Sequence, residues 1–174
     1  AFAMRPASTL DVMRKLRAAT DLPLWAKLTP NTGETSDVAR AAEEGGADAL
    51  VVSNTMLSMS IDVKSRKPRL GNLMGGLSGP SLKPISLRMA YQCAKAVDIP
   101  VIGCGGISTI DDVLEYLIAG ASAVQVGTAT FIHPTVMVQM IGALEAYLTE
   151  HNIPSVRDLI GSVRDEEAAD TVVF

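Results

Sequence analysis

The sequence has 174 residues, of which 48% are hydrophobic, and a formal net charge of −4, which suits one domain with a buried core. The pI is near 5.1 and no basic stripe alternates with aromatic residues, so we do not expect the protein to bind nucleic acid. No apolar stretch approaches the roughly 20 residues of a membrane span, and no signal-peptide pattern is present. Cys93 and Cys104 lack metal-site spacing. We therefore expect a mildly acidic cytoplasmic protein without a membrane span or a metal.

Hydrophobic periodicity divides the chain into alternating helices and strands. The first half is predicted to contain, in order, a helix over residues 8–20 capped by Ser8 or Thr9, a strand over 22–28, a helix over 34–46 and a strand over 47–54. A long polar stretch follows over residues 55–83. The second half is predicted to contain a helix over 84–97, a strand over 99–106, a helix over 109–120, a strand over 122–128, and helices over 134–150 and 155–163.

The strands are almost continuously apolar and alternate with helices, which is typical of a parallel sheet built from βα units. An internal repeat aligns "DLPLWAKL…GGADALVVSN" with "DIPVIGCGG…AGASAVQVGT", and the two Asp-x-Pro segments begin 77 residues apart at Asp21 and Asp98. Such duplication favours a (β/α)8 barrel, although a Rossmann-like sheet can also be duplicated. A full barrel takes about 250 residues and eight strands. The prediction is therefore an α/β fold with four parallel strands, half of a TIM barrel.

Two successive strands end in small-residue turns that could bind a phosphate. Gly105 and Gly106 follow one strand, and Gly127 and Thr128 follow the next. In a barrel the corresponding turns commonly hold phosphate through glycine amides and a helix N-terminus, and the Thr128 hydroxyl or that of Ser108 could add a donor. The alternative is that these glycines merely permit tight turns, but two such turns in succession favour a phosphate-bearing ligand.

Polar residues near the ends of two earlier strands are candidates for the same rim. Lys27 lies near the carboxyl end of an apolar strand, where it either contacts a ligand or extends its ammonium into solvent. Asn54 and Thr55 end the next strand; an amide suits a ligand with amide-like edges, although taken alone this pair is more typical of a turn. Cys104 has no base nearby in the sequence and is interpreted as a small buried residue. His133, before Pro134, is interpreted as local structure.

The polar stretch also carries two features of its own. "GGLSGPSLKP" over residues 75–84 is Gly-rich, and unstructured loops longer than about 12–15 residues are uncommon unless they act as lids or binding loops. Four basic residues precede it, and they form either a solvated surface or a docking surface for a partner: Lys64, Arg66, Lys67 and Arg69.

Taken together, "AKLTPN", "VVSNT", "GGLSGPSLKPISL", "VIGCGGI" and "GASAVQVGTA" resemble the dihydroorotate dehydrogenase family, FMN-dependent enzymes of pyrimidine synthesis. The likeness is nearest to the cytoplasmic class 1 enzymes, more to the NAD-linked type than to the fumarate-linked type, and it covers roughly residues 20–160. The motifs match the last four strands of the family's barrel. The resemblance thus implies that residues 1–164 form a C-terminal half-barrel and that residues 165–174 are a tail.

The resemblance assigns roles residue by residue. Lys27, Ser53 through its backbone, and Gly79 would contact the flavin of FMN. The glycine turns would hold its phosphate, and the substrate ring, dihydroorotate or orotate, would meet the end of the second strand. The phosphate residues are Gly105, Gly106, Gly127 and Thr128, and the substrate residues are Asn54 and Thr55.

The family's catalytic base, a Cys or Ser on a loop after the fourth barrel strand, is expected upstream of Ala1. The opening "AFAMRPAS" is also typical of the interior of a protein. We therefore expect no catalytic base in this chain and no activity without an N-terminal half-barrel. A homodimer and an FAD and iron–sulfur electron-transfer subunit are further expected partners. Two alternatives stay open: a related flavin pyrimidine reductase of the dihydropyrimidine dehydrogenase kind, and a non-catalytic FMN- or phosphate-binding half-barrel.

Overall fold

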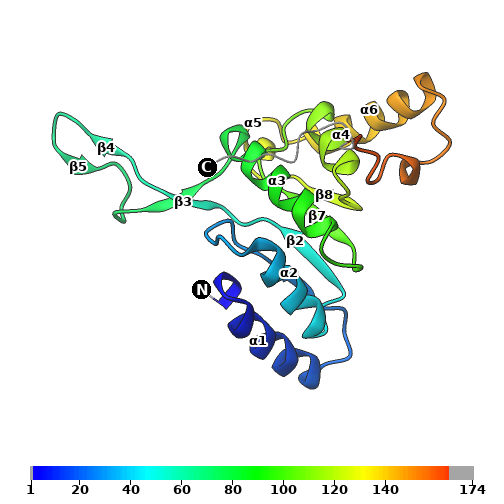
Figure 1. Ribbon diagram of the computed structural model, residues 1–174. Coiled ribbons are helices and arrows are strands. Elements are labelled where there is room, and N and C mark those ends of the chain that lie inside the picture. Colours follow the sequence, from blue (N-terminus) through cyan, green and yellow to red (C-terminus); the bar gives the residue numbers. More distant parts are fainter. Residues whose placement is uncertain (1, 165–174) are drawn as a thin grey trace.

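The centre of the molecule is a four-stranded parallel sheet with the order β1-β2-β7-β8 (Figure 1). The computed structural model describes residues 2–164. The sheet strands are β1 (Trp25–Lys27), β2 (Ala49–Val52), β7 (Val101–Cys104) and β8 (Ala123–Gln125). Each falls within a strand predicted from sequence, and the four parallel strands of a half-barrel are confirmed. β1 is shorter than the predicted 22–28, and Pro23, which has no N–H to donate to a ladder, lies outside it.

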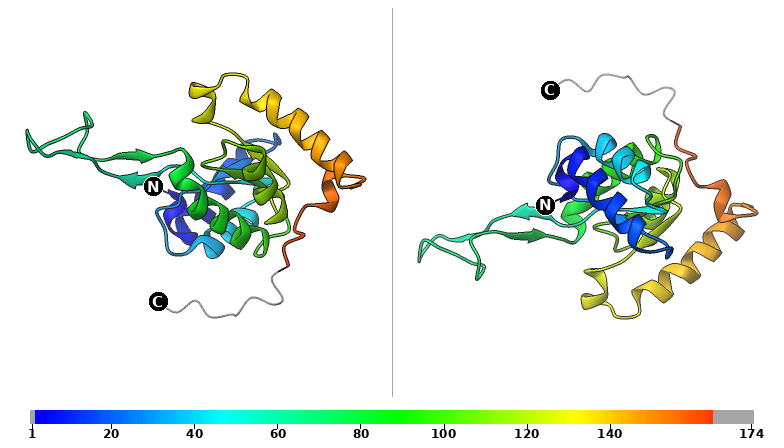
Figure 2. Two further views of the ribbon diagram at one scale, coloured as in Figure 1. Left: turned by 90° about the horizontal axis from the view of Figure 1, so that it is seen from above. Right: turned by 90° about the horizontal axis from the view of Figure 1, so that it is seen from below.

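Five longer helices alternate with these strands and form one layer over the sheet. They are α1 (Pro6–Ala19), α2 (Thr35–Glu44), α3 (Lys83–Ala94), α4 (Ile110–Ile118) and α6 (Val136–Glu150). α1 packs against α2, α2 against α3, α3 against α4, and α4 against α6, so the helices follow the chain around the outside of the sheet (Figures 1 and 2). α1 begins at Pro6 after Arg5, without a side-chain cap, so the prediction of a Ser8 or Thr9 cap is wrong. Proline is favoured at the first helical position because its missing N–H would be unpaired there anyway.

The helix-facing side of the sheet forms the main hydrophobic core. Leu50, Val52 and Val101 face this side, and their neighbours along β2 and β7 face the opposite side of the sheet. Each of the three is at most 2% exposed. Tyr116 of α4 is fully buried in the same core, and its ring lies against Gly103, where any Cβ would collide with it. Helices and strands are therefore fixed to each other by a close-packed layer on this side.

The opposite side of the sheet has only a small cluster of buried apolar residues. Ala49, Val51 and Ile102 form it, with Cys104 packed against them. Toward the β1 edge, Trp25 is 59% exposed although it is large and apolar. This is the side that faces the interior in a closed barrel, and among the described residues no helix layer covers it (Figure 2).

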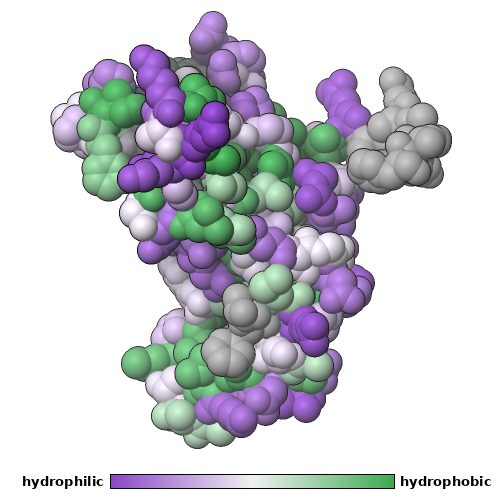
Figure 3. All heavy atoms as spheres, turned by 90° about the vertical axis from the view of Figure 1, so that its left-hand side faces the viewer, coloured by the Kyte–Doolittle hydropathy of each residue, from purple (hydrophilic) through white to green (hydrophobic). Residues whose placement is uncertain are grey.

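Residues 56–77 form an arm of two short antiparallel ribbons, where no strands were predicted from sequence. β3 (Met56–Ser58) pairs with β6 (Gly75–Leu77), and β4 (Ile61–Asp62) pairs with β5 (Lys67–Pro68). The arm projects from the body of the molecule (Figures 1 and 2). Figure 3 faces this side and shows hydrophobic residues interspersed with hydrophilic ones. The four basic residues noted above are all exposed on the arm.

Several short helical turns complete the structure. These are η1 (Phe2–Met4), η2 (Pro80–Leu82), α5 (Ala129–Ile132) and η3 (Val156–Asp158). α5 was not predicted. The predicted helix over 155–163 is reduced to η3, whose cap Ser155 accepts from the N–H of Arg157 at 3.2 Å. The predicted tail over 165–174 lies outside the described residues, and within residues 2–164 no helix is long and apolar enough to cross a membrane.

Candidate functional site

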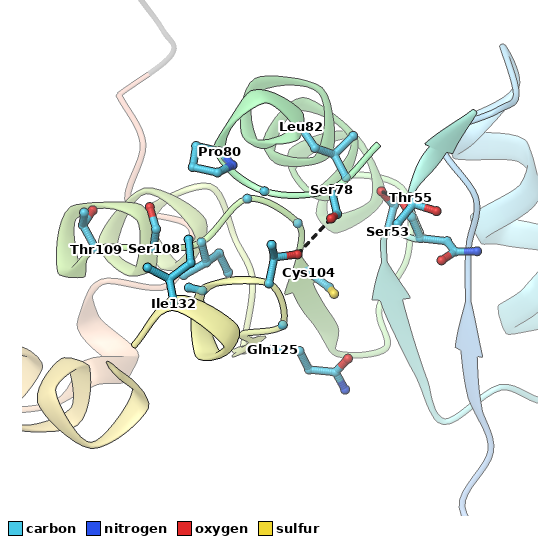
Figure 4. Close-up of a pocket in the computed structure, with 18 of the residues that line it drawn as sticks. Ser53, Thr55, Ser78, Pro80, Leu82, Cys104, Ser108, Thr109, Gln125 and Ile132 are labelled. Atoms are coloured by element: carbon cyan, nitrogen blue, oxygen red, sulfur yellow. Dashed lines mark hydrogen bonds between the residues drawn. The ribbon is translucent and has the colours of Figure 1, made fainter. Parts of the chain in front are cut away.

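The carboxyl ends of the four sheet strands open into a cavity of about 460 Å³ (Figure 4). Parallel strands bring these ends to the same edge of the sheet, which is where ligands bind in α/β folds. Every site residue predicted from sequence lines this cavity: Lys27, Ser53, Asn54, Thr55, Gly79, Gly105, Gly106, Gly127 and Thr128. The structure thus brings together residues that are up to 101 positions apart, from Lys27 to Thr128.

The first side of the cavity is formed by the ends of β1, β2 and β7. The Lys27 ammonium lies 4.0 Å from the Cys104 sulfur, and the Lys27 side chain is exposed on the uncovered side of the sheet. Ser53 is 2% exposed; its N–H donates to the Cys104 carbonyl at 2.6 Å, and its hydroxyl shares a 3.0 Å hydrogen bond with that of Ser86. Ser53 is therefore held rigidly, while Lys27 is free to meet a ligand.

The Gly105–Gly106 turn lies between the start of α3 and the start of α4. Both glycines have positive φ, +136° and +73°, which side chains other than glycine rarely adopt. They also have no room for a Cβ: at Gly105 it would lie 2.5 Å from the Ser86 hydroxyl, and at Gly106 it would lie 2.6 Å from the backbone nitrogen of Lys83. The glycines are thus required by close packing as well as by the turn.

Gly127 and Thr128 form the second turn, directly before α5. A Cβ built on Gly127 would meet nothing within 4 Å, so this glycine leaves open space beside the cavity. The Thr128 hydroxyl donates to the Ser78 hydroxyl at 2.9 Å (dashed line in Figure 4), which ties the turn to the base of the arm. Gly79, with a φ of +84°, follows Ser78 and directly precedes η2. The segment from Ser78 to Leu82, directly after the arm, therefore closes one side of the cavity.

The two glycine turns line the cavity and contain backbone N–H donors. Within residues 2–164, the N–H groups of Gly105, Gly106 and Gly127 donate to no protein acceptor. Unengaged amides at successive turns, beside a glycine whose missing side chain leaves space, match the donor set of a phosphate site. Of the two hydroxyls considered as extra donors, that of Ser108 donates to Asp112 at 3.0 Å and that of Thr128 to Ser78, so neither is directed to a ligand here.

Asn54 and Thr55 lie where β2 passes into the arm. The Asn54 N–H donates to the Leu28 carbonyl at 2.8 Å, which fixes its backbone and leaves its side chain exposed. The Thr55 carbonyl accepts from the Asn31 amide at 3.3 Å, and the same Asn31 side chain accepts from the Leu57 N–H at 2.8 Å. Asn31 thus anchors the base of the arm, a role that the sequence patterns did not indicate.

The cavity also contains residues that were not assigned to a site from sequence. Ser78, Cys104, Gln125 and His133 all line it. Gln125 ends β8 in register with Cys104, and a polar residue inside "AVQVGT" was the available signal. His133 does make local hydrogen bonds at the end of α5, as expected, but it also borders the cavity. Among the described residues no group of His, Cys, Asp and Glu side chains could hold a metal.

The known proteins that match this chain are dihydroorotate dehydrogenases. The family model described as dihydroorotate dehydrogenase matches residues 1–148. Relatives named dihydroorotate dehydrogenase B (NAD(+)), catalytic subunit, include those of Pelobacter propionicus, 48% identical over 162 residues, and Desulforamulus reducens, 49% identical over 152 residues. The alignments cover 93% and 87% of this chain but 53% and 50% of the relatives.

The chain therefore spans about half the length of these curated relatives. The family match covers most of the sequence, including every strand of the sheet and every predicted site residue. This chain belongs to the dihydroorotate dehydrogenase family.

Proposed function

We propose that this chain is the phosphate-binding half of an FMN-dependent enzyme that oxidises dihydroorotate to orotate in pyrimidine synthesis. The observation that carries the proposal is the pair of glycine turns, whose unengaged amides face one cavity together with the other residues assigned by resemblance. The residues present fit FMN, because a phosphate needs several converging donors and a flavin needs a wide, partly apolar space.

The chain's own residues divide into two groups for this task. Gly105, Gly106, Gly127 and Thr128, the last through its backbone N–H, would hold the phosphate, and Lys27, Ser53 and Gly79 would contact the flavin. Bound FMN would supply the acceptor for the hydride that leaves dihydroorotate. A lysine ammonium beside the flavin favours the electron-rich form of the flavin. The buried Ser53 backbone would hold the flavin in one orientation.

Asn54 and Thr55 would bind the pyrimidine ring of the substrate. The Asn54 amide can donate and accept at once, which matches the amide edges of dihydroorotate. The base that removes the substrate proton would come from an N-terminal half-barrel, so this chain alone would bind ligand without turning it over. The relatives' name includes NAD(+), and we propose NAD as the final electron acceptor, reached through an FAD and iron–sulfur subunit of a cytoplasmic assembly.

The surfaces of the sheet support the proposal of a second half-barrel. Strands β1 and β8 are the two edges of the sheet, each with one unpaired side among the described residues. Beside β8 lies an apolar groove of about 500 Å³, lined by Val113, Val124, Gln125, Val126, Met137, Met140, Ile141 and Leu144. Unpaired parallel edges and an apolar groove are features that another part of a barrel would cover. A homodimer of the completed barrel is the further assembly we propose.

The experiment that tests the proposal measures flavin binding by the purified chain. Gly127→Val fills the open space beside the cavity and should weaken FMN binding by at least about tenfold, or 1.4 kcal/mol. Gly71→Val is the matched control, because Gly71 also has nothing within 4 Å of an added Cβ but lies on the arm, outside the cavity. Equal FMN affinity for both variants would contradict the proposed phosphate site.

Turnover separates this proposal from the two alternatives. Dihydroorotate should reduce bound FMN only when an N-terminal half-barrel is added, and uracil should have no effect on it. A preference for uracil would favour a dihydropyrimidine dehydrogenase-like reductase. FMN binding without reduction by either ring, even with the other half present, would favour a non-catalytic module.

A further inference from the structure

The buried carboxylate of Asp112 lies directly behind the Gly105–Gly106 turn, and neither the family match nor the site residues above give it a role. Asp112 is 6% exposed and belongs to the first turn of α4. One of its oxygens accepts from the Ser108 N–H at 2.8 Å, the Thr109 N–H at 2.8 Å and the Ser108 hydroxyl at 3.0 Å. Thr109 completes a capping box by accepting from the Asp112 N–H at 3.2 Å.

The second Asp112 oxygen is held by Lys83, the first residue of α3. The Lys83 ammonium donates to it at 2.6 Å and to Glu115 at 2.9 Å, and the Lys83 side chain is 24% exposed. The backbone of Lys83 also lies against Gly106. The start of α3, the glycine turn and the start of α4 are therefore joined at one point behind the cavity.

A turn of two consecutive glycines needs such an anchor. Glycine loses more conformational freedom on folding than any other residue, so a Gly-Gly turn does not hold one shape by itself. Here the turn is fixed at both ends: the Gly105 carbonyl accepts from the Tyr116 hydroxyl at 2.8 Å, and the residues after Gly106 are held by Asp112. Because these bonds use the amides of Ser108 and Thr109, the amides of this turn left for an anion are those of Gly105, Gly106 and Ile107.

We infer that Asp112, held in place by Lys83, is a positioning residue that fixes the glycine turn in its phosphate-binding conformation. Lys83 has a second effect, because it reduces the charge of the two carboxylates behind the turn from −2 to −1. An anion bound on the other side of the turn meets less repulsion as a result. This inference rests on the proposed FMN function, since it concerns the phosphate end of that ligand.

The test compares FMN with riboflavin, which has the same ring but no phosphate, by fluorescence titration of the full 174-residue chain. Asp112→Asn should raise the Kd for FMN about tenfold and change the Kd for riboflavin less than about twofold. Asp111→Asn is the control, because it removes the same charge from an exposed residue of the same helical turn. It should leave both affinities unchanged.

Lys83→Met is the second variant and decides the question if Asp112→Asn does not fold. It should weaken FMN binding more than riboflavin binding, and the loss should shrink as salt is added, because salt screens the uncovered carboxylates. A role in stability alone would move both flavins together, in parallel with the melting temperature.

The outcomes separate the two claims. Selective loss of FMN affinity supports the positioning role. If wild type prefers FMN over riboflavin but the variants keep that preference, the inference on Asp112 is overturned and the proposed function stands. If the wild-type chain has no preference for FMN, the phosphate site fails and both claims fall.

Discussion

The two sides of the sheet differ in what holds their residues in place. On the helix-covered side, Leu50 and Val52 are fully buried in a continuous core. On the other side, Trp25 is 59% exposed and Lys27 extends toward the cavity. Residues on the two sides of the sheet therefore serve different purposes: one set stabilises the half-barrel, and the other is available to ligand and to further protein. Substitutions on the first side should cost stability, and those on the second should cost binding.

The largest effect is expected from breaking the covered side. Leu50→Ala should lower the free energy of unfolding by about 2–5 kcal/mol, because it removes buried methyl groups and leaves a cavity. Trp25→Ala removes more atoms from the open side and should cost less than about 1 kcal/mol. Urea denaturation of both variants measures the difference. Equal losses would mean that the open side is as important for stability as the covered side.

The same difference explains which parts of the fold could be predicted from sequence. Continuous apolar runs such as "ADALVVSN" identify buried strands, and parallel strands place their carboxyl ends together whatever the details of packing. Hence Lys27, Asn54, Thr55 and the two glycine turns could be identified from strand ends, whereas Ser53 and Gly79 were assigned only through the resemblance to the family. The same apolar runs do not show which side of each strand is covered, so the exposure of Trp25 could not be predicted.

The sequence patterns did not predict the elements whose stability depends on residues far away in the chain. Met56–Ser58 and Gly75–Leu77 are three-residue strands, and each is stable only because the other pairs with it across the arm. Gly, Pro and basic residues in that stretch obscure the alternation of apolar and polar residues that would predict a strand. The role of Asp112 was missed for a similar reason, since its partner Lys83 lies 29 positions away on another helix. Local patterns predict a capping residue but not the charge that holds it.

A smaller effect is expected from pH, and it concerns the carboxylate that joins the covered core to the site. Burial raises the pKa of Asp112, but hydrogen bonds from Lys83, Ser108 and Thr109 outweigh it and hold the pKa well below its usual range. The stabilisation is therefore complete above the ordinary carboxyl pKa of about 3.9 and is lost as the pH falls below it. The Lys83 pKa is raised by its bond to Asp112, so both groups stay ionised at neutral pH.

Asp112→Asn should accordingly cost about 1.5–3 kcal/mol at pH 7, with a difference from wild type that shrinks below about pH 4. Asp11→Asn is the control: the Asp11–Lys15 pair has side chains 61% and 74% exposed, and its loss should cost under about 0.5 kcal/mol. Urea denaturation across this pH range measures both. A constant difference for Asp112→Asn would show that its charge contributes nothing.

The smallest effect is expected at Tyr116, which contacts both the covered core and the edge of the cavity. Its ring is fully buried in the covered core, while its hydroxyl donates to the Gly105 carbonyl at the edge of the cavity. Burial raises the pKa of this hydroxyl, so it stays protonated and remains a donor. Tyr116→Phe keeps the ring and removes only the hydroxyl, with its hydrogen bonds to the Gly105 carbonyl and the Ser86 side chain, which should lower the free energy of unfolding by about 1 kcal/mol.

Tyr147→Phe is the matched control, because the Tyr147 ring stacks on His151 at the far end of α6, away from the cavity. It should change the free energy of unfolding by less than about 0.5 kcal/mol. If the Gly105 carbonyl is a true anchor of the turn, Tyr116→Phe should also weaken FMN binding relative to riboflavin, as Asp112→Asn does. If stability falls but the preference for FMN over riboflavin does not change, Tyr116 acts only in the covered core. Asp112 is then the residue that anchors the turn for phosphate binding.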